Sequence, residues 1–286
     1  TKEFSWTSSF NISFNRNKVL SLNDDEPSLA SRVNWGNFNN AYPYIAIPGH
    51  PIAMFYGHIF DGVYQYTDFD KVGESYILKD GVPNNGNARE KIQPGDIKFK
   101  DINRDGVVND YDLTIIGNPN PKHIGGFGNN FQYKNFDLNV FFQWSYGGDV
   151  LNANRIEFEG GDPNARTSLN MFASFANRWT PENQTNELYR IGGQGPAVYS
   201  LRTIEDGSFL RLKTVSLGYR LPNAWLKKIN IKSLRVYASA QNLITWTRYS
   251  GPDPEVSTRP TALTPSFDWS PYPRPRTLTL GVDISF

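Results

Sequence analysis

Hydrophobic and polar side chains alternate along several stretches of this chain. In residues 4–14 the large apolar side chains fall on one face of an extended strand, and serine, threonine and asparagine fall on the other. The same alternation returns in 136–146, with Phe141 as the one exception, and again in 276–286. Successive side chains of a strand point to opposite faces, so each stretch predicts a β-strand with one apolar and one polar surface.

Four more stretches have a similar strand pattern: 18–22, 124–133, 210–220 and 234–243. Residues 15–17 predict a hairpin turn that joins the first strand to 18–22, and the region 44–66 is expected to add extended structure. The short connections are 15–17, 134–135 and 221–233. The long connections are 23–123, 147–209 and 244–275. The two kinds alternate, as in membrane barrels with short periplasmic turns and long outer loops. The order therefore favours an all-β, antiparallel transmembrane β-barrel whose long connections are extracellular.

Aromatic residues gather at the ends of the predicted strands. Trp144 and Tyr146 lie at the end that leads into a long connection. Four others lie at the end with short turns: Tyr133, Phe136, Tyr219 and Phe286. Two such groups are typical of the aromatic girdles at the two membrane interfaces. A soluble β-sandwich also alternates and would use the same aromatics as core, so this alternative stays open.

The predicted strands do not make a complete barrel. Seven strands are counted, whereas single-chain bacterial barrels close with an even number. An edge strand at 4–14 would be costly in lipid, so we expect preceding sequence to supply further strands. The chain starts at Thr1 without a signal-peptide pattern or an initiator methionine, which indicates a processed, cleaved or truncated chain.

Composition and charge narrow the choice of partners. The 286 residues include 29 basic and 28 acidic side chains, for a net charge of +1, and no basic block stands out. Phosphate binding needs a concentrated positive surface, so nucleic acid is not expected as a partner. The chain has no cysteine, which excludes a disulfide framework and a thiolate metal site within it.

The strongest local motif lies in residues 101–112, where the sequence fits the calcium-loop pattern D-x-[DN]-x-[DN]-G-x5-[DE]. Gly106 permits the sharp turn of such a loop. We predict a structural calcium ion, with these ligands: Asp101, Asn103, Asp105, the carbonyl of Val107, Asn109 and Asp112. Asp112 reaches less far than the glutamate found in many such loops. The alternative is an Asx-rich turn held by its own hydrogen bonds. Flanking sequence predicts turn and strand before the loop and at most a short helix at 111–116.

Catalytic patterns are weak throughout the sequence. The three histidines lack metal-ligand spacing: His50, His58 and His123. Glu157 and Glu159 could imitate a glycosidase pair, but neighbouring carboxylates on a polar loop are usually solvated. The glycines of 125–128 precede a strand rather than a helix, which argues against a phosphate-binding loop. We therefore expect no enzymatic activity.

Three stretches carry a family resemblance. They are Gly95-Asp96-Ile97-Lys98-Phe99 running through the calcium-like loop to Ile115-Ile116-Gly117; 209–213 followed by 215–219; and 234–237 leading to Gln241-Asn242-Leu243. With them the chain resembles the C-terminal part of SusC/RagA-type TonB-dependent outer-membrane transporters. The last strand, which ends in Phe286, also resembles an outer-membrane assembly signal.

The resemblance implies a 22-stranded barrel with an N-terminal plug in a Gram-negative outer membrane. Such a transporter is energised through TonB and imports oligosaccharides or peptides beneath a SusD-like surface lipoprotein lid. No plug is recognised in this sequence. The chain would then supply barrel wall and extracellular loops, with a periplasmic C-terminus. Its partners would be the lid, the N-terminal barrel and plug portion, TonB through that portion, the substrate and outer-membrane lipid.

A secreted, calcium-stabilised β-sandwich that binds carbohydrate is the alternative function. Aromatic residues in or beside the long connections could stack against sugar rings: Trp179, Tyr199, Trp246, Tyr249, Trp269 and Tyr272. The same residues could touch substrate or lid in a transporter, or simply fill loop packing. The sequence does not assign substrate-binding residues.

Overall fold

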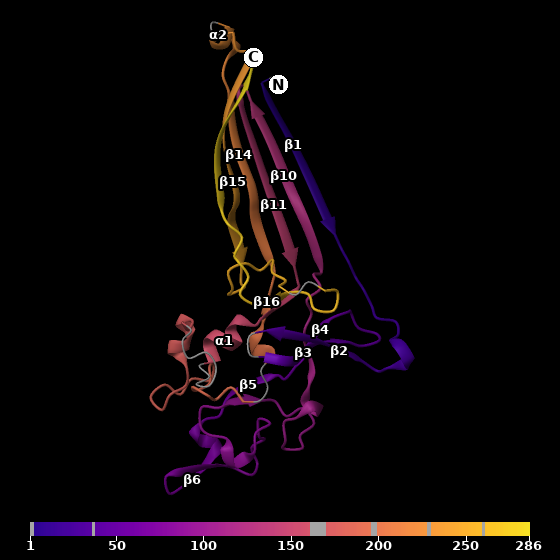
Figure 1. Cartoon of the computed structure of the whole chain (residues 1–286), viewed down its shortest axis with the longest axis vertical. Coiled ribbons are helices and arrows are strands. Elements are labelled where there is room, and N and C mark those ends of the chain that lie inside the picture. The colour runs from indigo at the N-terminus through magenta and orange to yellow at the C-terminus, as the bar shows by residue number, and fades with distance from the viewer. Residues whose placement is uncertain (1–2, 36–37, 161–169, 196–198, 228–229, 259–260) are drawn as a thin grey trace.

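A computed structural model describes residues 3–35, 38–160, 170–195, 199–227, 230–258 and 261–286. Long strands run side by side as one sheet, and the segments that connect them gather in a layer beyond one end of it (Figure 1). We call this the loop end of the sheet. The opposite end, where both chain termini and the short connections lie, is the turn end.

The long sheet has six antiparallel strands in the order β1-β10-β11-β14-β15-β17. Their bounds are β1 (Phe4–Ser13), β10 (His123–Tyr133), β11 (Phe136–Tyr146), β14 (Phe209–Arg220), β15 (Ser233–Thr247) and β17 (Thr277–Ser285). The only helix of the turn end among the described residues is α2 (Asn223–Leu226), in the connection from β14 to β15. The predicted all-β, antiparallel wall is therefore present.

The predicted hairpin between 4–14 and 18–22 is wrong. β1 pairs along its length with β10, from Phe4 opposite Tyr133 to Ser13 opposite Ile124. Val19 instead exchanges backbone hydrogen bonds with Gly49 and His50 in the outer layer. Residues 18–22 alternate too briefly to specify a partner, and tertiary pairing takes the chain elsewhere.

The correction changes the strand count from seven to six but keeps the alternation of connections. The long connections are 14–122, 147–208 and 248–276, in place of the predicted 23–123, 147–209 and 244–275. β15 continues to Thr247, so Trp246 lies on a strand opposite Leu210 and not in a loop. Within the described residues β1 and β17 each pair on one side only. Such open edges need further strands if the sheet lies in hydrocarbon.

The layer at the loop end is built from short strands. A four-stranded sheet contains β2 (Leu29–Trp35), β3 (Phe38–Ala46), β4 (Met54–Gly57) and β9 (Thr114–Gly117). Two strand pairs are β5 (Phe60–Val63) with β8 (Ile97–Phe99) and β6 (Phe69–Val72) with β7 (Ser75–Leu78). A three-stranded sheet joins β13 (Ile204–Asp206), β12 (Asp149–Asn152) and β16 (Phe267–Asp268). The expected extended structure in 44–66 is confirmed by β3, β4 and β5.

Helices are short in this layer. The α-helix is α1 (Asn154–Gly160). The 3-10 helices are η1 (Asn23–Asp25), η2 (Tyr66–Asp68), η3 (Arg89–Lys91), η4 (Asp110–Asp112), η5 (Ala173–Asn177) and η6 (Leu201–Thr203). The helix expected at 111–116 is limited to η4, because β9 begins at Thr114 and pairs with β4.

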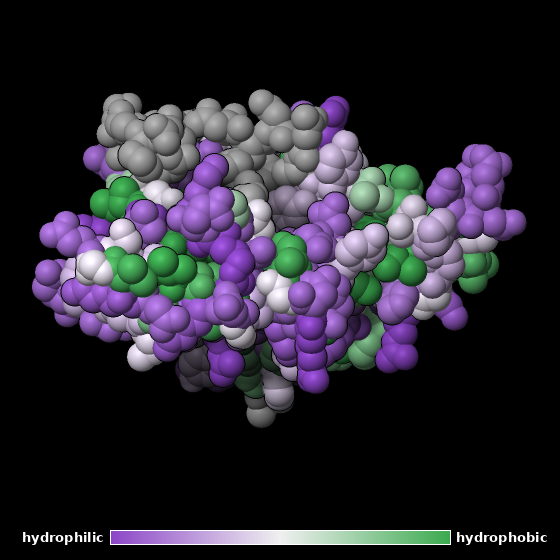
Figure 2. All heavy atoms as spheres, turned by 90° about the horizontal axis from the view of Figure 1, so that it is seen from below, coloured by the Kyte–Doolittle hydropathy of each residue, from purple (hydrophilic) through white to green (hydrophobic). Residues whose placement is uncertain are grey.

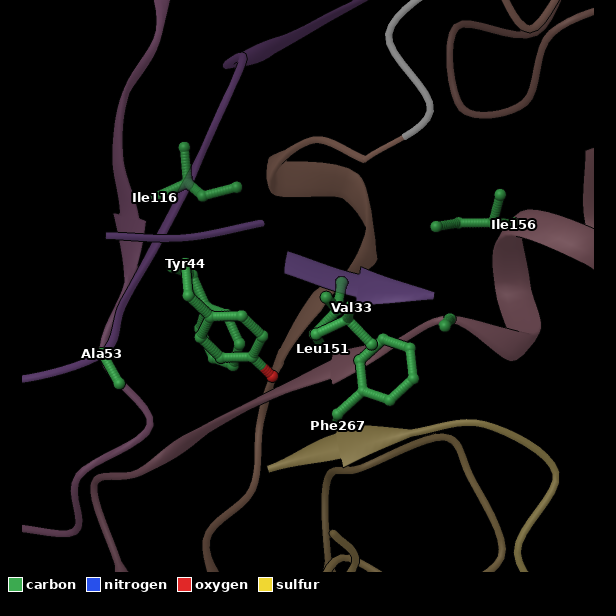
Figure 3. Close-up of a cluster of buried hydrophobic side chains, with 9 residues drawn as sticks. Val33, Tyr44, Ala53, Ile116, Leu151, Ile156 and Phe267 are labelled. Atoms are coloured by element: carbon green, nitrogen blue, oxygen red, sulfur yellow. The ribbon is translucent and has the colours of Figure 1, made fainter. Parts of the chain in front are cut away.

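The main core of the outer layer joins all three long connections. Val33 of β2, Leu151 of β12 and Phe267 of β16 point toward one another, and each is at most 3% exposed (Figure 3). Tyr44 lies beside them and donates its hydroxyl to the carbonyl of Pro265, at 2.7 Å. The connections are therefore packed into one body on the loop end of the sheet.

Candidate conduit surface and calcium loop

The apolar face of the long sheet is uncovered in the described part of the chain. Leu278 and Leu280 on β17 are 78% and 85% exposed, and Phe10 on β1 is 63% exposed. Monomeric soluble proteins rarely leave so continuous an apolar surface in water. The sandwich alternative required a second sheet against these residues, and the structure contradicts it. Outward apolar residues on every strand are instead typical of a wall in contact with lipid.

Aromatic side chains lie at both ends of this apolar face, as predicted. At the turn end, the ring centroids of Phe136 and Tyr219 are 4.6 Å apart. At the loop end, Tyr146 stacks on His123 with centroids 5.1 Å apart, and the indole of Trp144 donates to His123 Nδ1 at 3.1 Å. His123 therefore accepts the indole hydrogen bond of one girdle aromatic and stacks on another.

The opposite face of the sheet is polar and crossed by ion pairs. Near the turn end, Arg235 on β15 reaches Asp137 on β11, with an Nη2–Oδ2 distance of 2.6 Å, and Asp283 on β17, at 3.2 Å. Its guanidinium crosses β14 above Gly218, where a Cβ would lie 2.5 Å from Arg235 Nη2. A glycine is needed at position 218 because the Arg235 side chain occupies the space that any larger side chain would fill.

A second ion cluster lies near the loop end of the polar face. Arg211 on β14 is 1% exposed; it contacts Asp253 at 2.5 Å and Glu255 at 3.2 Å, and its Nε donates to Thr245 at 3.1 Å. Arg274 binds Glu255 at 2.8 Å. The connection 248–276 is thus fixed against the polar face of the wall by a buried arginine.

The predicted calcium loop has the closed shape that its sequence indicates. Asp101 accepts backbone N–H groups from Arg104 and Gly106, at 2.6 and 2.8 Å. Asp112 is fully buried and accepts from Ile102 at 2.7 Å and from Asn109 at 2.9 Å, which joins the two ends of the loop. Asn103 Oδ1 accepts a hydrogen bond from the backbone N–H of Asp105, and Asp105 Oδ1 accepts one from the backbone N–H of Val107.

These contacts fit a calcium ion without requiring one. Each carboxylate or amide oxygen that accepts one hydrogen bond keeps a lone pair for a cation. The same contacts are the Asx-turn bonds of the alternative. Among the residues that the structure describes, no cluster of three or more His, Cys, Asp or Glu side chains is arranged for a metal; the predicted set also uses two asparagines and a carbonyl. Calcium therefore remains a prediction.

Several other sequence candidates have structural roles. Trp179 is 5% exposed and donates to Gln65 at 3.1 Å, and Tyr249 is buried with its hydroxyl bonded to Asp268. Neither is free to stack on a sugar. Tyr272, at 90% exposed, is available to a partner.

The carboxylate of Glu159 is not solvated as expected. It is buried on α1 and paired with Arg155 at 3.0 Å and Arg202 at 2.6 Å. Burial raises the pKa of Glu159, but the two arginines outweigh it and hold the pKa below its ordinary value. Glu159 is a packed anion within a network and lacks the raised pKa of a general acid.

The fold and its surfaces define a class of protein. In the described residues no helix is long and apolar enough to span a membrane. The antiparallel sheet has one exposed apolar face with aromatic residues at both ends and an opposite polar face, which together are typical of the wall of a membrane β-barrel.

Comparisons with known proteins show which proteins the chain is similar to. No family model matches the chain. It is 34% identical over 290 residues to TonB-dependent receptor P3 of Formosa agariphila, covering 100% of this chain and 27% of that receptor. It is 29% identical over 294 residues to TonB-dependent receptor SusC of Bacteroides thetaiotaomicron, covering 25% of it. The structure of the RagAB peptide transporter matches 100% of this chain and 28% of its own, with a TM-score of 0.72 and 24% identity.

The chain thus spans about a quarter of the length of the curated relatives it matches. The similarity to part of SusC/RagA-type TonB-dependent receptors, predicted from the sequence, is confirmed. The likeness to RagAB shows that the fold is shared as well.

Proposed function

We propose that this chain forms barrel wall and extracellular loops of a TonB-dependent importer of oligosaccharides or peptides in a Gram-negative outer membrane. The observation that carries the proposal is the exposed apolar face, opposite a polar face, in a chain similar throughout to TonB-dependent receptors. In this proposal the loop end is extracellular, the turn end and Phe286 are periplasmic, and other sequence completes 22 strands and supplies the plug and the TonB contact.

A SusD-like lipoprotein is proposed as the lid over the loop end. SusC and the RagAB transporter are the relatives that suggest a two-protein importer. The loop end, seen from below in Figure 2, is mostly hydrophilic with scattered apolar patches. Such a surface suits a partner that opens and closes in water. We propose no catalytic role for the chain.

The importer proposal is tested by deleting the gene for the full-length receptor in its own organism. We expect the receptor to fractionate with outer membranes, to require detergent for purification, and to be needed for growth on one glycan or peptide as sole nutrient. A chain that purifies from detergent-free buffer as a soluble monomer, or a deletion strain that grows normally on every such nutrient, would contradict the proposal.

The calcium loop is proposed to brace the outer layer. In the purified receptor, replacing both Asp101 and Asp105 with alanine removes two of the predicted ligand side chains. Calcium affinity should therefore fall by more than the roughly 10–100-fold that is typical when only a residue supporting a ligand is changed. The measurement is bound calcium per receptor by elemental analysis after dialysis. Asp110→Ala is the matched control, because Asp110 is exposed in the same loop but is not a predicted ligand. Unchanged metal content in the double variant would reject the site.

A further inference from the structure

Phe141 is the one apolar side chain that interrupts the alternation of β11, and the structure explains where it goes. On β11 it lies between Val140 and Phe142, which belong to the apolar face, so its side chain is on the polar face. It is opposite Gly128 on β10 and Thr214 on β14. A large aromatic ring therefore lies on the polar face, opposite a glycine on one neighbouring strand and a threonine on the other.

Two glycines make room for this ring against the backbone of β10. A Cβ on Gly126 would be 2.8 Å from Phe141 Cζ, and one on Gly128 would be 3.6 Å from Cδ2. The ring thus extends along β10 over backbone that carries no side chains. Both glycines belong to the stretch 125–128, to which the sequence alone assigned no role. They let the ring lie close to the backbone of β10.

The ring lines an open cavity on the polar face. The cavity has a volume of about 770 Å³ and lies between the wall and the connection 248–276. Its wall side includes Phe141, Asn11 and Gln143, and its loop side includes Glu255 and Ser257. Arg211 fixes the loop side through Asp253 and Glu255. The cavity is therefore bounded by fixed elements, which is the arrangement expected of a binding site.

The charges that line the cavity are already engaged. Glu255 is paired with Arg211 and Arg274, and Asp149 accepts the backbone N–H of Asn118 at 2.7 Å. Burial raises the pKa of Asp149. Amide and hydroxyl groups remain for a ligand. A peptide could not extend the sheet here, because β10 and β11 are paired on both sides.

We propose that this cavity is a transit subsite for neutral oligosaccharides and that the flat ring of Phe141 stacks on a sugar ring there. The inference rests on the proposed import function and names its substrate class. Aromatic faces bind the apolar C–H faces of sugar rings, while Asn11, Gln143 and Ser257 offer partners for hydroxyl groups.

The test uses the full-length receptor with its lid, expressed in the deletion strain. The probes are a panel of neutral oligosaccharides from starch, laminarin, xylan and dextran, with tryptic casein peptides for contrast. For the oligosaccharide that the wild type takes up, Phe141→Leu should raise the half-saturating concentration roughly three- to tenfold, because it keeps apolar bulk but removes the flat face. Phe141→Tyr should restore uptake to within about twofold of the wild type, by the same stacking argument.

The matched control is Phe142→Leu, a change of the same size on the lipid-facing side of the same strand. It should leave the half-saturating concentration unchanged, and receptor abundance in outer membranes is measured for every variant. Normal uptake by an abundant Phe141→Leu variant would overturn the subsite. Equal loss of abundance in Phe141→Leu and Phe141→Tyr would also overturn it and show that the ring serves only packing.

The outcomes separate this inference from the importer proposal. A wild-type receptor that supports growth on the peptides but on none of the oligosaccharides would overturn the subsite and leave the importer intact. A deletion strain that grows like the wild type on every probe would remove both.

Discussion

Replacing Arg211 with alanine should release the connection 248–276 from the wall. Arg211 is 1% exposed and Asp253 is 7% exposed, so the substitution leaves a buried carboxylate with only its longer contact to Arg274, at 3.8 Å. Breaking a buried ion pair from one side typically costs about 3–5 kcal/mol. Even about 3 kcal/mol would raise the population of the released loop about a hundredfold.

The release can be measured by thiol labelling, because the described chain has no cysteine of its own. In a full-length receptor freed of any other cysteine, Val256→Cys places a half-buried thiol on the cavity side of the loop. A membrane-impermeant maleimide should label this thiol much faster when Arg211 is alanine. Arg274→Ala is the control: Arg274 contacts the same two carboxylates but its side chain is 40% exposed, so the change should be small. Equal labelling rates for all three receptors would show that Arg211 does not hold the loop.

Replacing Phe267 with alanine should loosen the outer layer while the long sheet stays folded. Phe267 is fully buried between strands from different connections, and it pairs with Leu151 on β12. Truncation of a buried phenylalanine typically costs about 3–5 kcal/mol, from lost burial and the cavity left behind. We expect faster proteolysis within 14–122 and 147–208 in the detergent-solubilised receptor, with the strands still protected.

Tyr272→Ala provides the comparison, because Tyr272 is 90% exposed in the same connection and its loss should leave proteolysis unchanged. If Phe267→Ala behaves like Tyr272→Ala, the cluster around Phe267 does not stabilise the layer. If the long strands are cut as quickly as the connections, the layer and the sheet unfold as one unit.

The strands could be predicted from the sequence, but their pairing could not. Local alternation predicted β1, β11 and β17, because a strand with one wet and one apolar face has a period of two. It did not predict that β1 pairs with β10, since the two are separated by the whole connection 14–122. Trp6 and Asn129, 123 residues apart, share a hydrogen bond of 3.0 Å that lets an asparagine lie on the apolar face.

Of the two candidate sites, the calcium loop could be predicted from the sequence and the cavity could not. The calcium loop is a contiguous motif, so its ligands could be proposed from spacing alone, and the observed turn geometry agrees with that spacing. The cavity could not be found in this way, because Phe141, Asn11 and Glu255 come from three distant segments. The only signals in the sequence were the interrupted alternation at Phe141 and the glycines of 125–128.

The sequence by itself determined that several strands have one apolar and one polar face, since side-chain alternation along a strand decides which residues share a face. It also carried the resemblance to SusC/RagA-type TonB-dependent transporters and the calcium-loop motif at 101–112. Only the tertiary structure decided that 18–22 leaves the sheet, that Arg211 fixes a distant loop, and that Phe141 rests on two glycines. Each of these depends on contacts between segments far apart in the chain, and no local pattern records such contacts.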